Sequence, residues 1–212
     1  MAEARARMVQ RQLIGRGIRD KRVLQAFREV RRHLFVESAF LTEAYSDFPL
    51  PIGHAQTISQ PYIVAAMVEA MEIGPDSVVL EIGTGSGYET AILAELASRV
   101  YTVEVIPELA EEARKRLTGM GYSNIHYRIG DGAAGWPEAG RFDGIIVSAA
   151  PRRVDPRLLD QLADGACCIV PEGDERQLLR KYRRRGDDCR VETLMPVRFV
   201  PLVGTPDSSR ER

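Results

Sequence analysis

The chain has 212 residues, 44% of them hydrophobic, and a formal net charge of -1 at pH 7. This length suits one α/β domain with an appendage, and the near-neutral charge excludes the strongly basic footprint typical of proteins that bind nucleic acid or anionic membranes. No apolar stretch is long enough to span a bilayer, and the first residues, MAEARARMVQRQ, lack the apolar core of a signal peptide. We therefore expect a cytoplasmic protein that has neither nucleic acid nor membrane as a partner.

The amino-terminal third is predicted to be helical and then irregular. Residues 2–14 have helix-forming composition and are followed by Gly15 and Gly17, and Asp20 is placed to cap a second helix over residues 21–30. Residues 33–60 contain Pro49, Pro51 and several aromatic residues, which favours an ordered loop lying over the core. Long loops of this kind usually carry function.

From residue 61 onward, predicted helices alternate with predicted strands. Helices are expected from Pro61 to about Met71, from Tyr88, from Pro107 to about Met120 and from Asp155 or Pro156. Strands are expected at residues 78–80, 100–103, 125–129, 142–147 and 167–170. This alternation predicts an α/β fold with a doubly wound, mainly parallel sheet. Residues 177–182 and 190–197 flank a polar turn and predict an antiparallel hairpin added at one edge.

A glycine-rich loop follows the strand at residues 78–80, with the pattern Glu81-x-Gly83-x-Gly85-x-Gly87. It lies between the carboxyl end of a strand and the start of a helix, where open α/β sheets bind ligands. The next strand ends at Glu104, whose carboxylate can accept both hydroxyls of a ribose.

Two nucleoside ligands fit a glycine loop followed by an acid. The dinucleotide fingerprint is G-x-G-x-x-G, and an acid two residues before the first glycine, here Glu81, would repel a pyrophosphate but suits a ligand with an ammonium and a sulfonium. We therefore favour S-adenosyl-L-methionine. A dinucleotide enzyme and a tight turn without a ligand remain the alternatives.

Metal and redox chemistry are not predicted. Cys167, Cys168 and Cys189 are odd in number, lack C-x-x-C spacing and have no histidine at ligand spacing. Their strand context favours reduced, buried thiols.

Several longer segments resemble the protein-L-isoaspartate O-methyltransferase family. The glycine loop is common to many methyltransferases, whereas the QTISQPY segment is specific to this family. The matching segments, which together span roughly residues 8–204, are PLPIG at 49–53, QTISQPY at 56–62, LEIGTGSGY at 80–88, GDG at 130–132, IVSAA at 146–150 and RFVPL at 198–202.

This resemblance implies the Rossmann-like methyltransferase fold and a repair activity. The enzyme would move a methyl group from S-adenosyl-L-methionine to the free carboxylate of L-isoaspartyl residues in damaged proteins and peptides, giving a methyl ester and S-adenosyl-L-homocysteine. The alternatives are a methyltransferase of the same fold with another substrate, and a module that binds the donor without activity.

The resemblance also implies roles for individual residues. Thr57, Ile58 and Ser59 would close over the donor and the isoaspartyl carboxylate, with Ser59 as the active-site residue. Glu104 would hold the ribose, and Asp131 with Gly132 would lie beside the adenine. The full set of implied donor-binding residues is Glu81, Gly83, Thr84, Gly85, Ser86, Gly87, Glu104, Asp131 and Gly132.

The implied reaction needs little acid–base chemistry. A free carboxylate is already ionised at neutral pH, so the protein's task is to hold the reacting atoms in line and to exclude water. Ser59 is then expected to orient the carboxylate as a hydrogen-bond donor, without acting as a nucleophile.

The chain departs from the family pattern at a few positions. Ala55 stands where the family usually has glycine, Ser148 where it has threonine, and Glu172 where it has valine. We expect Glu172 to alter either substrate preference or local stability. Trp136 could flank the adenine or cover the edge of the core.

These observations predict a single methyltransferase domain over residues 1–204. It would comprise N-terminal helices and a substrate loop (1–60), the core sheet (61–175) and a C-terminal hairpin (176–204). Residues 205–212 are expected to form a flexible tail, and the protein is expected to be a monomer.

Overall fold

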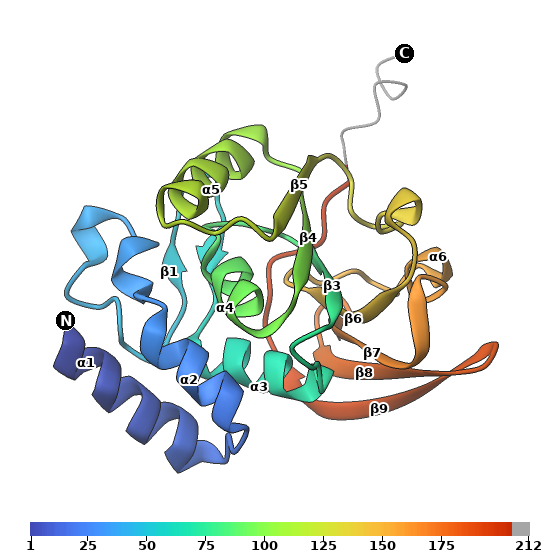
Figure 1. Cartoon of the computed structure of the whole chain (residues 1–212), viewed down its shortest axis with the longest axis horizontal. Coiled ribbons are helices and arrows are strands. Elements are labelled where there is room, and N and C mark those ends of the chain that lie inside the picture. Colours follow the sequence, from blue (N-terminus) through green and yellow to red (C-terminus); the bar gives the residue numbers. More distant parts are fainter. Residues whose placement is uncertain (205–212) are drawn as a thin grey trace.

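A seven-stranded sheet forms the centre of the computed structural model, which describes residues 1–204 (Figure 1). Its strand order is β5-β4-β3-β6-β7-β8-β9. Strands β5 to β7 in this order run parallel, whereas β8 and β9 are each antiparallel to their neighbours. The strands are β3 (Val78–Ile82), β4 (Arg99–Glu104), β5 (Ile125–Ile129), β6 (Phe142–Val147), β7 (Leu162–Glu172), β8 (Gln177–Arg185) and β9 (Asp188–Val197). The predicted mainly parallel sheet with a C-terminal hairpin is confirmed, and the predicted tail lies outside the described residues.

The helices begin where the sequence signals placed them. The Asp20 side chain accepts hydrogen bonds from the backbone N–H groups of Arg22 and Val23, so it is the expected cap of α2. Pro61 and Pro107 occupy first helical turns, where the missing proline N–H costs nothing. The α-helices are α1 (Ala2–Arg7), α2 (Lys21–Glu29), α3 (Pro61–Met71), α4 (Tyr88–Leu96), α5 (Pro107–Gly119) and α6 (Pro156–Leu159). Within residues 1–204, no helix is both long and apolar enough to cross a membrane.

Alternate residues of the central strands face two different hydrophobic cores. On β3, Val79 packs with α3, α4 and the N-terminal helices, whereas Leu80 and Ile82 pack in a second core with Leu158 of α6. This two-residue period follows from the pleat of a strand. Figure 1 shows the N-terminal helices beside α3 and α4 at one side of the sheet. Glu81, one residue before Ile82, therefore points to the α4 side.

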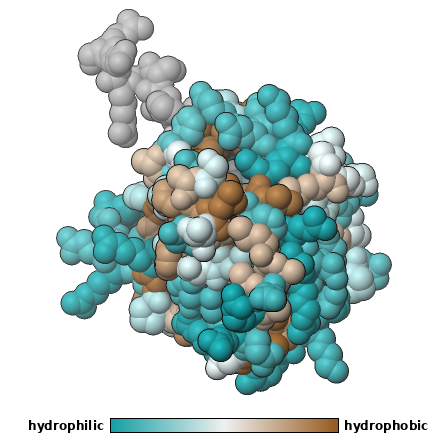
Figure 2. All heavy atoms as spheres, turned by 90° about the vertical axis from the view of Figure 1, so that its left-hand side faces the viewer, coloured by the Kyte–Doolittle hydropathy of each residue, from teal (hydrophilic) through white to brown (hydrophobic). Residues whose placement is uncertain are grey.

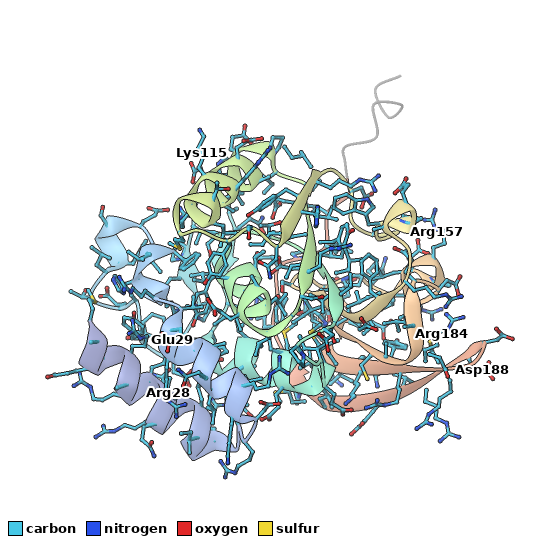
Figure 3. All side chains as sticks on the ribbon, in the orientation of Figure 1. Arg28, Glu29, Lys115, Arg157, Arg184 and Asp188 are labelled. Carbon is cyan, nitrogen blue, oxygen red and sulfur yellow. The ribbon has the colours of Figure 1, made fainter. Side chains whose placement is uncertain are left out.

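Polar and apolar residues are separated on the face of the molecule that Figure 2 shows. On the face with the N-terminal helices, polar residues dominate the periphery and apolar residues gather toward the middle (Figure 2). Charged side chains such as Lys115, Arg157 and Asp188 lie at the periphery of the molecule (Figure 3), and Arg28 and Glu29 are also exposed. Because these charged groups remain in water, folding imposes no desolvation cost on them.

Several predicted boundaries need correction. Strands β3, β4, β8 and β9 extend one to three residues beyond their predicted limits, so that β3 includes Glu81. Three differences are larger. Residues 33–60 contain regular structure: two 3-10 turns, Arg32–Leu34 and Ser38–Phe40, and a short hairpin of β1 (Leu50–Pro51) and β2 (Thr57–Ile58). The helix expected over residues 2–14 changes to a π-helical segment at Met8–Leu13 and a 3-10 turn at Ile14–Arg16. Strand β7 is longer than residues 167–170, because β8 pairs with it as far as Glu172.

The side chain of Glu172 makes hydrogen bonds within the fold. Its carboxylate accepts hydrogen bonds from the Val154 backbone N–H at 3.0 Å and from the Tyr182 hydroxyl at 2.9 Å. It therefore joins β7 and β8 to the loop before α6. It does not line the cavity described below, so the alternative of local stability is the one that the structure supports.

Candidate functional site

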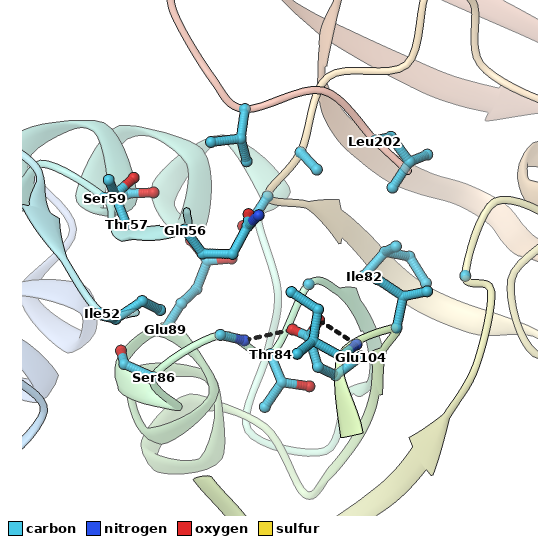
Figure 4. A pocket seen from close by; sticks show the side chains of 18 of the residues that line it. Ile52, Gln56, Thr57, Ser59, Ile82, Thr84, Ser86, Glu89, Glu104 and Leu202 are labelled. Atoms are coloured by element: carbon cyan, nitrogen blue, oxygen red, sulfur yellow. Dashed lines mark hydrogen bonds between the residues drawn. The ribbon is translucent and has the colours of Figure 1, made fainter. Parts of the chain in front are cut away.

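A cavity opens at the carboxyl ends of the parallel strands (Figure 4). We call the part formed by these strand ends and by the first turn of α4 the floor. Its strand-end residues follow four strands: Gly83, Thr84, Gly85 and Ser86 after β3, Glu104, Val105 and Ile106 at β4, Gly130 and Gly132 after β5, and Ser148 and Ala149 after β6. Parallel strands bring these short segments together because their carboxyl ends share one edge of the sheet.

Two segments far apart in the sequence complete the cavity, and we call them the cover. One is the β1–β2 hairpin, which contributes Ile52 and residues 56–59, and the other is residues 200–203 near the described carboxyl end. The second segment is held to the floor by backbone hydrogen bonds, from the Ala150 N–H to the Val200 carbonyl at 2.8 Å and from the Leu202 N–H to the Ala150 carbonyl at 2.9 Å.

The glycine loop needs its glycines for backbone conformation. Gly83, Gly85 and Gly87 have φ angles of 98°, 52° and 85°, a region that side chains other than glycine rarely adopt. Gly87 also packs closely, since a Cβ there would lie 3.0 Å from a Leu117 methyl carbon. Gly87 does not line the cavity; it lies directly before α4 and packs against Leu117 of α5.

Glu104 is a fixed acceptor at one end of the floor. Its side chain is 6% exposed, and its two oxygens accept hydrogen bonds from the Gly85 N–H at 2.8 Å and the Ile106 N–H at 3.0 Å. Figure 4 shows both bonds. The carboxylate therefore ties the β3 loop to the β4 loop and remains in contact with the cavity, because each oxygen has a second lone pair.

Glu81 does not lie where the sequence argument placed it. Its side chain is fully buried on the α4 side of β3, and one oxygen accepts hydrogen bonds of 2.6 Å from the hydroxyls of Thr90 and Thr102. Burial, together with the nearby carboxyl of Glu89, raises the pKa of Glu81 well above its ordinary value. Glu81 does not line the cavity, so its assignment as a ligand-facing acid is corrected: the strand pleat turns it away.

Glu89 is an acid of the floor that sequence reasoning missed. It lies in the first turn of α4, is 8% exposed and lines the cavity. The Ser148 hydroxyl donates a hydrogen bond of 2.5 Å to its carboxyl, and burial raises the pKa of Glu89 to about 7. A signal was available, because an acid two residues after Gly87 falls in the first turn of a helix that starts at the ligand loop.

The segment at residues 130–132 contributes backbone and little else. Gly130 and Gly132 line the cavity, whereas Asp131 is exposed, accepts a hydrogen bond from the Ala133 N–H at 2.8 Å and does not line it. A Cβ at Gly132 would lie 2.6 Å from the Ile82 side chain, which explains why only glycine fits there.

Trp136 covers the core. Its ring packs edge-on against Tyr101 at 5.2 Å, and the Arg128 guanidinium lies 5.5 Å from its centre. It does not line the cavity, so of the two alternatives for this residue the structure supports core packing.

Two of the three predicted substrate residues, Thr57 and Ser59, lie together at the opposite side of the cavity from Glu104 (Figure 4). Thr57, Ile58 and Ser59 all line it from β2 and the residue that follows. Ile58 is buried and anchors the hairpin through its pairing with Leu50, while Thr57 is exposed and Ser59 is half-buried.

The lining combines acids with apolar walls. Ile82, Val103, Ile106 and Leu202 supply apolar surface, and Glu89 and Glu104 are its only charged groups within residues 1–204, where no lysine, arginine or histidine lines it. Such a site suits a ligand that carries positive charge, hydroxyls and a flat apolar ring, and it disfavours a pyrophosphate. Within the described part of the chain, no group of three potential metal ligands gathers.

Comparisons with known proteins agree with this description. The family model of protein-L-isoaspartate(D-aspartate) O-methyltransferase matches residues 4–207. A protein-L-isoaspartate O-methyltransferase of Picosynechococcus is 52% identical over 200 residues, covering 94% of this chain and 90% of that protein. One from Trichlorobacter lovleyi is 52% identical over 203 residues, covering 95% and 94%.

Solved structures have the same fold. A protein-L-isoaspartate O-methyltransferase structure superposes with a TM-score of 0.86 at 27% identity, covering 94% of this chain and 66% of that one. A Plasmodium falciparum structure, described as a complex with S-adenosyl-L-homocysteine, has a TM-score of 0.80 at 24% identity, covering 92% and 96%. The second likeness supports the fold.

Proposed function

The chain belongs to the protein-L-isoaspartate O-methyltransferase family, and from this premise we propose that it methylates the free carboxylate of L-isoaspartyl residues in damaged proteins and peptides. The methyl donor is S-adenosyl-L-methionine, and the products are the methyl ester and S-adenosyl-L-homocysteine. The observation that carries the proposal is the cavity itself, in which the glycine loop and Glu104 face the Thr57–Ser59 segment.

The residues present fit this donor. The floor offers backbone without Cβ atoms at Gly83, Gly85 and Gly132, and a fixed carboxylate at Glu104 that can accept from ribose hydroxyls. Thr84 and Ser86 belong to the same loop, and apolar side chains flank Gly132 where an adenine would lie. When bound, the donor supplies a methyl group on a positively charged sulfur.

The protein's own contribution is orientation and exclusion of water. Ser59 lines the cavity, from where it would donate a hydrogen bond to the substrate carboxylate, and the cover would shield the reacting atoms from solvent. Methyl transfer from a sulfonium to a carboxylate neutralises two charges, so it is favoured in a site of low polarity. Since the carboxylate is ionised at neutral pH, no side-chain base is required.

A pair of peptides tests the proposal directly. The protein is incubated with S-adenosyl-L-methionine carrying a labelled methyl group and with two peptides that differ only in an aspartyl or isoaspartyl linkage. We expect base-labile label in the isoaspartyl peptide alone. Equal labelling of both peptides would contradict the repair function, and label on neither would favour another substrate or a binding module.

The setting of the reaction is also part of the proposal. We propose a monomeric, cytoplasmic enzyme that recognises its substrates by the isoaspartyl linkage, with residues 1–204 forming one methyltransferase domain. The relatives' shared description as protein-L-isoaspartate O-methyltransferases supports the substrate. Light scattering after size-exclusion chromatography at several concentrations would test the monomer, since a mass above 23.6 kDa would exclude it.

A further inference from the structure

The floor holds a second acid for which the roles proposed above have no use. Glu89 projects from the first turn of α4 into the cavity, toward the Gln56 side of the cover (Figure 4). Ser148 hydrogen-bonds one of its oxygens from the loop after β6. In this view Glu89 lies next to Gln56, between the side of the cavity that holds Thr57 and Ser59 and the side that holds Glu104.

Few charged groups near Glu89 could pair with a positively charged ligand group. From β3 comes Glu81 and from β4 Glu104, both acids. Arg32 is fully buried and does not line the cavity; its guanidinium lies 4.9 Å from the ring centre of Tyr88, the residue before Glu89. On the cover, His54 lines a neighbouring groove together with Glu112 and Arg116 of α5.

The three carboxyl groups differ in the hydrogen bonds that they already accept. Glu104 accepts two backbone N–H groups, one on each oxygen. Glu81 accepts two hydroxyls and does not face the cavity. Glu89 accepts one hydroxyl through a single oxygen and lines the cavity, so its carboxyl is the one in this group that is free to meet a ligand cation in the middle of the cavity.

We propose that Glu89 is the counter-ion of the positively charged methionine end of the methyl donor, and that donor binding expels a proton from its carboxyl. This inference rests on the proposed function. The Glu89 carboxylic acid gives its proton to the buffer and becomes a carboxylate beside the incoming cation.

The coupling follows from charge. Burial raises the pKa of Glu89 to about 7, and the Ser148 hydrogen bond opposes this shift. A cation placed beside the carboxyl stabilises the ionised form and lowers its pKa, so at pH values below 7 the donor can bind well only if the proton leaves. By linkage, donor affinity should fall by up to about tenfold per pH unit below the free-state pKa and level off above it.

Titration calorimetry with S-adenosyl-L-methionine measures this proton. The titration is run at about pH 6 in two buffers with different ionisation enthalpies, in a range below the ordinary pKa of an α-amino group. For the wild-type protein we expect release of close to one proton per donor bound, together with a Kd that rises as the pH falls from about 7 to about 6.

Three variants identify the group. Glu89→Gln should bind the donor with no proton release and with a Kd independent of pH, whereas Glu81→Gln should release the proton as the wild type does. Ser148→Ala removes the bond that lowers the pKa of Glu89, so its proton release should persist to higher pH. The carboxyl signal of Glu89, observed by NMR in the free protein, should titrate near the same pH as the affinity.

The product identifies which positive charge is involved. S-adenosyl-L-homocysteine retains the ammonium and lacks the sulfonium, so equal proton release for both ligands assigns the ammonium, and release with the donor alone assigns the sulfonium. Donor binding without proton release in the wild type would overturn the inference, as would unchanged release in Glu89→Gln, which would point to another group such as His54. Neither result would affect the peptide assay, whereas absence of donor binding would sink the proposed function as well.

Discussion

The floor and the cover of the cavity are built in different ways. Floor residues follow directly from the ends of neighbouring parallel strands, and their polar groups are fixed by short hydrogen bonds such as that from the Gly85 N–H to Glu104. Cover residues come from segments at 50–59 and 200–203 that meet only in the folded chain. The hairpin of the cover also places two residues other than glycine, His54 and Ala55, at positive φ.

This difference suggests a division of labour. A floor fixed by strand geometry suits the donor, whose shape is constant. A cover made of separate segments can be shaped for one substrate without disturbing the sheet. The expected outcomes below test whether the two parts are separable, beginning with the largest effect.

The free energy of unfolding should fall as the pH rises, because the Glu89 carboxyl is buried in the floor. The pKa of Glu89 is raised from 4.5 to about 7, so between these values the folded protein binds a proton that the unfolded chain has lost. The free energy of unfolding should therefore fall, relative to Glu89→Gln, by on the order of 3 kcal/mol as pH rises from about 4.5 to 7. Urea unfolding of both proteins without donor measures this, and parallel pH curves would contradict it.

Glu104→Ala should weaken the floor's hold on the donor. The change removes a charged acceptor from the ribose and leaves the Gly85 and Ile106 N–H groups without their partner. We expect a loss of roughly 1.5 to 3 kcal/mol in donor affinity, measured by calorimetry. Glu108→Ala, at an exposed position in the first turn of α5, is the matched control. An unchanged Kd in Glu104→Ala would remove this residue from the site.

Ser59→Ala tests the cover, and it should lower kcat without weakening donor binding. If the hydroxyl only orients an ionised carboxylate, the variant should lose roughly ten- to a hundred-fold in kcat, about the value of one hydrogen bond to a charged group. The Kd for the donor should not change. Ser123→Ala serves as the control, because Ser123 is exposed and does not line the cavity. A covalent intermediate on Ser59 would refute the orienting role, and a tenfold weaker Kd would show that floor and cover are not separable.

Asp131→Ala should have a small effect, because the side chain is exposed and does not line the cavity. Its carboxylate accepts the Ala133 N–H and so shapes the loop that carries Gly132. We expect donor affinity to fall by about 1 kcal/mol or less, with the preference for isoaspartyl over aspartyl peptides retained. If the peptide preference were lost in the labelling assay, Asp131 would belong with the cover.

Ala55→Gly should stabilise the cover slightly. Ala55 has a φ of 56°, where a side chain costs about 1 to 2 kcal/mol, and glycine recovers that cost less its greater freedom in the unfolded chain. The expected gain is about 0.5 kcal/mol in the free energy of unfolding. Ala94→Gly, inside α4, should have the opposite sign because it weakens a helix. A loss of stability in both variants would mean that Ala55 makes contacts that outweigh its strain.

The order of the elements and much of the floor could be predicted from local sequence signals. Apolar runs, proline starts and glycine stops are local signals, so α3, β5 and β6 have their predicted limits. The same local logic brought Gly83, Gly85 and Glu104 to one edge, because a parallel sheet must gather the carboxyl ends of its strands. The family was also evident from contiguous segments such as QTISQPY.

The direction of individual side chains was decided by tertiary structure. Glu81 and Glu89 stand eight residues apart, at the end of a strand and the start of a helix. The strand pleat turns Glu81 into the space beside Thr90 and Thr102, while the first helical turn aims Glu89 at the cavity. Sequence spacing gives a residue's position along an element, but which of two acids faces a ligand depends on the packing of strand against helix, which brings Thr90, Thr102 and Ser148 from other parts of the chain.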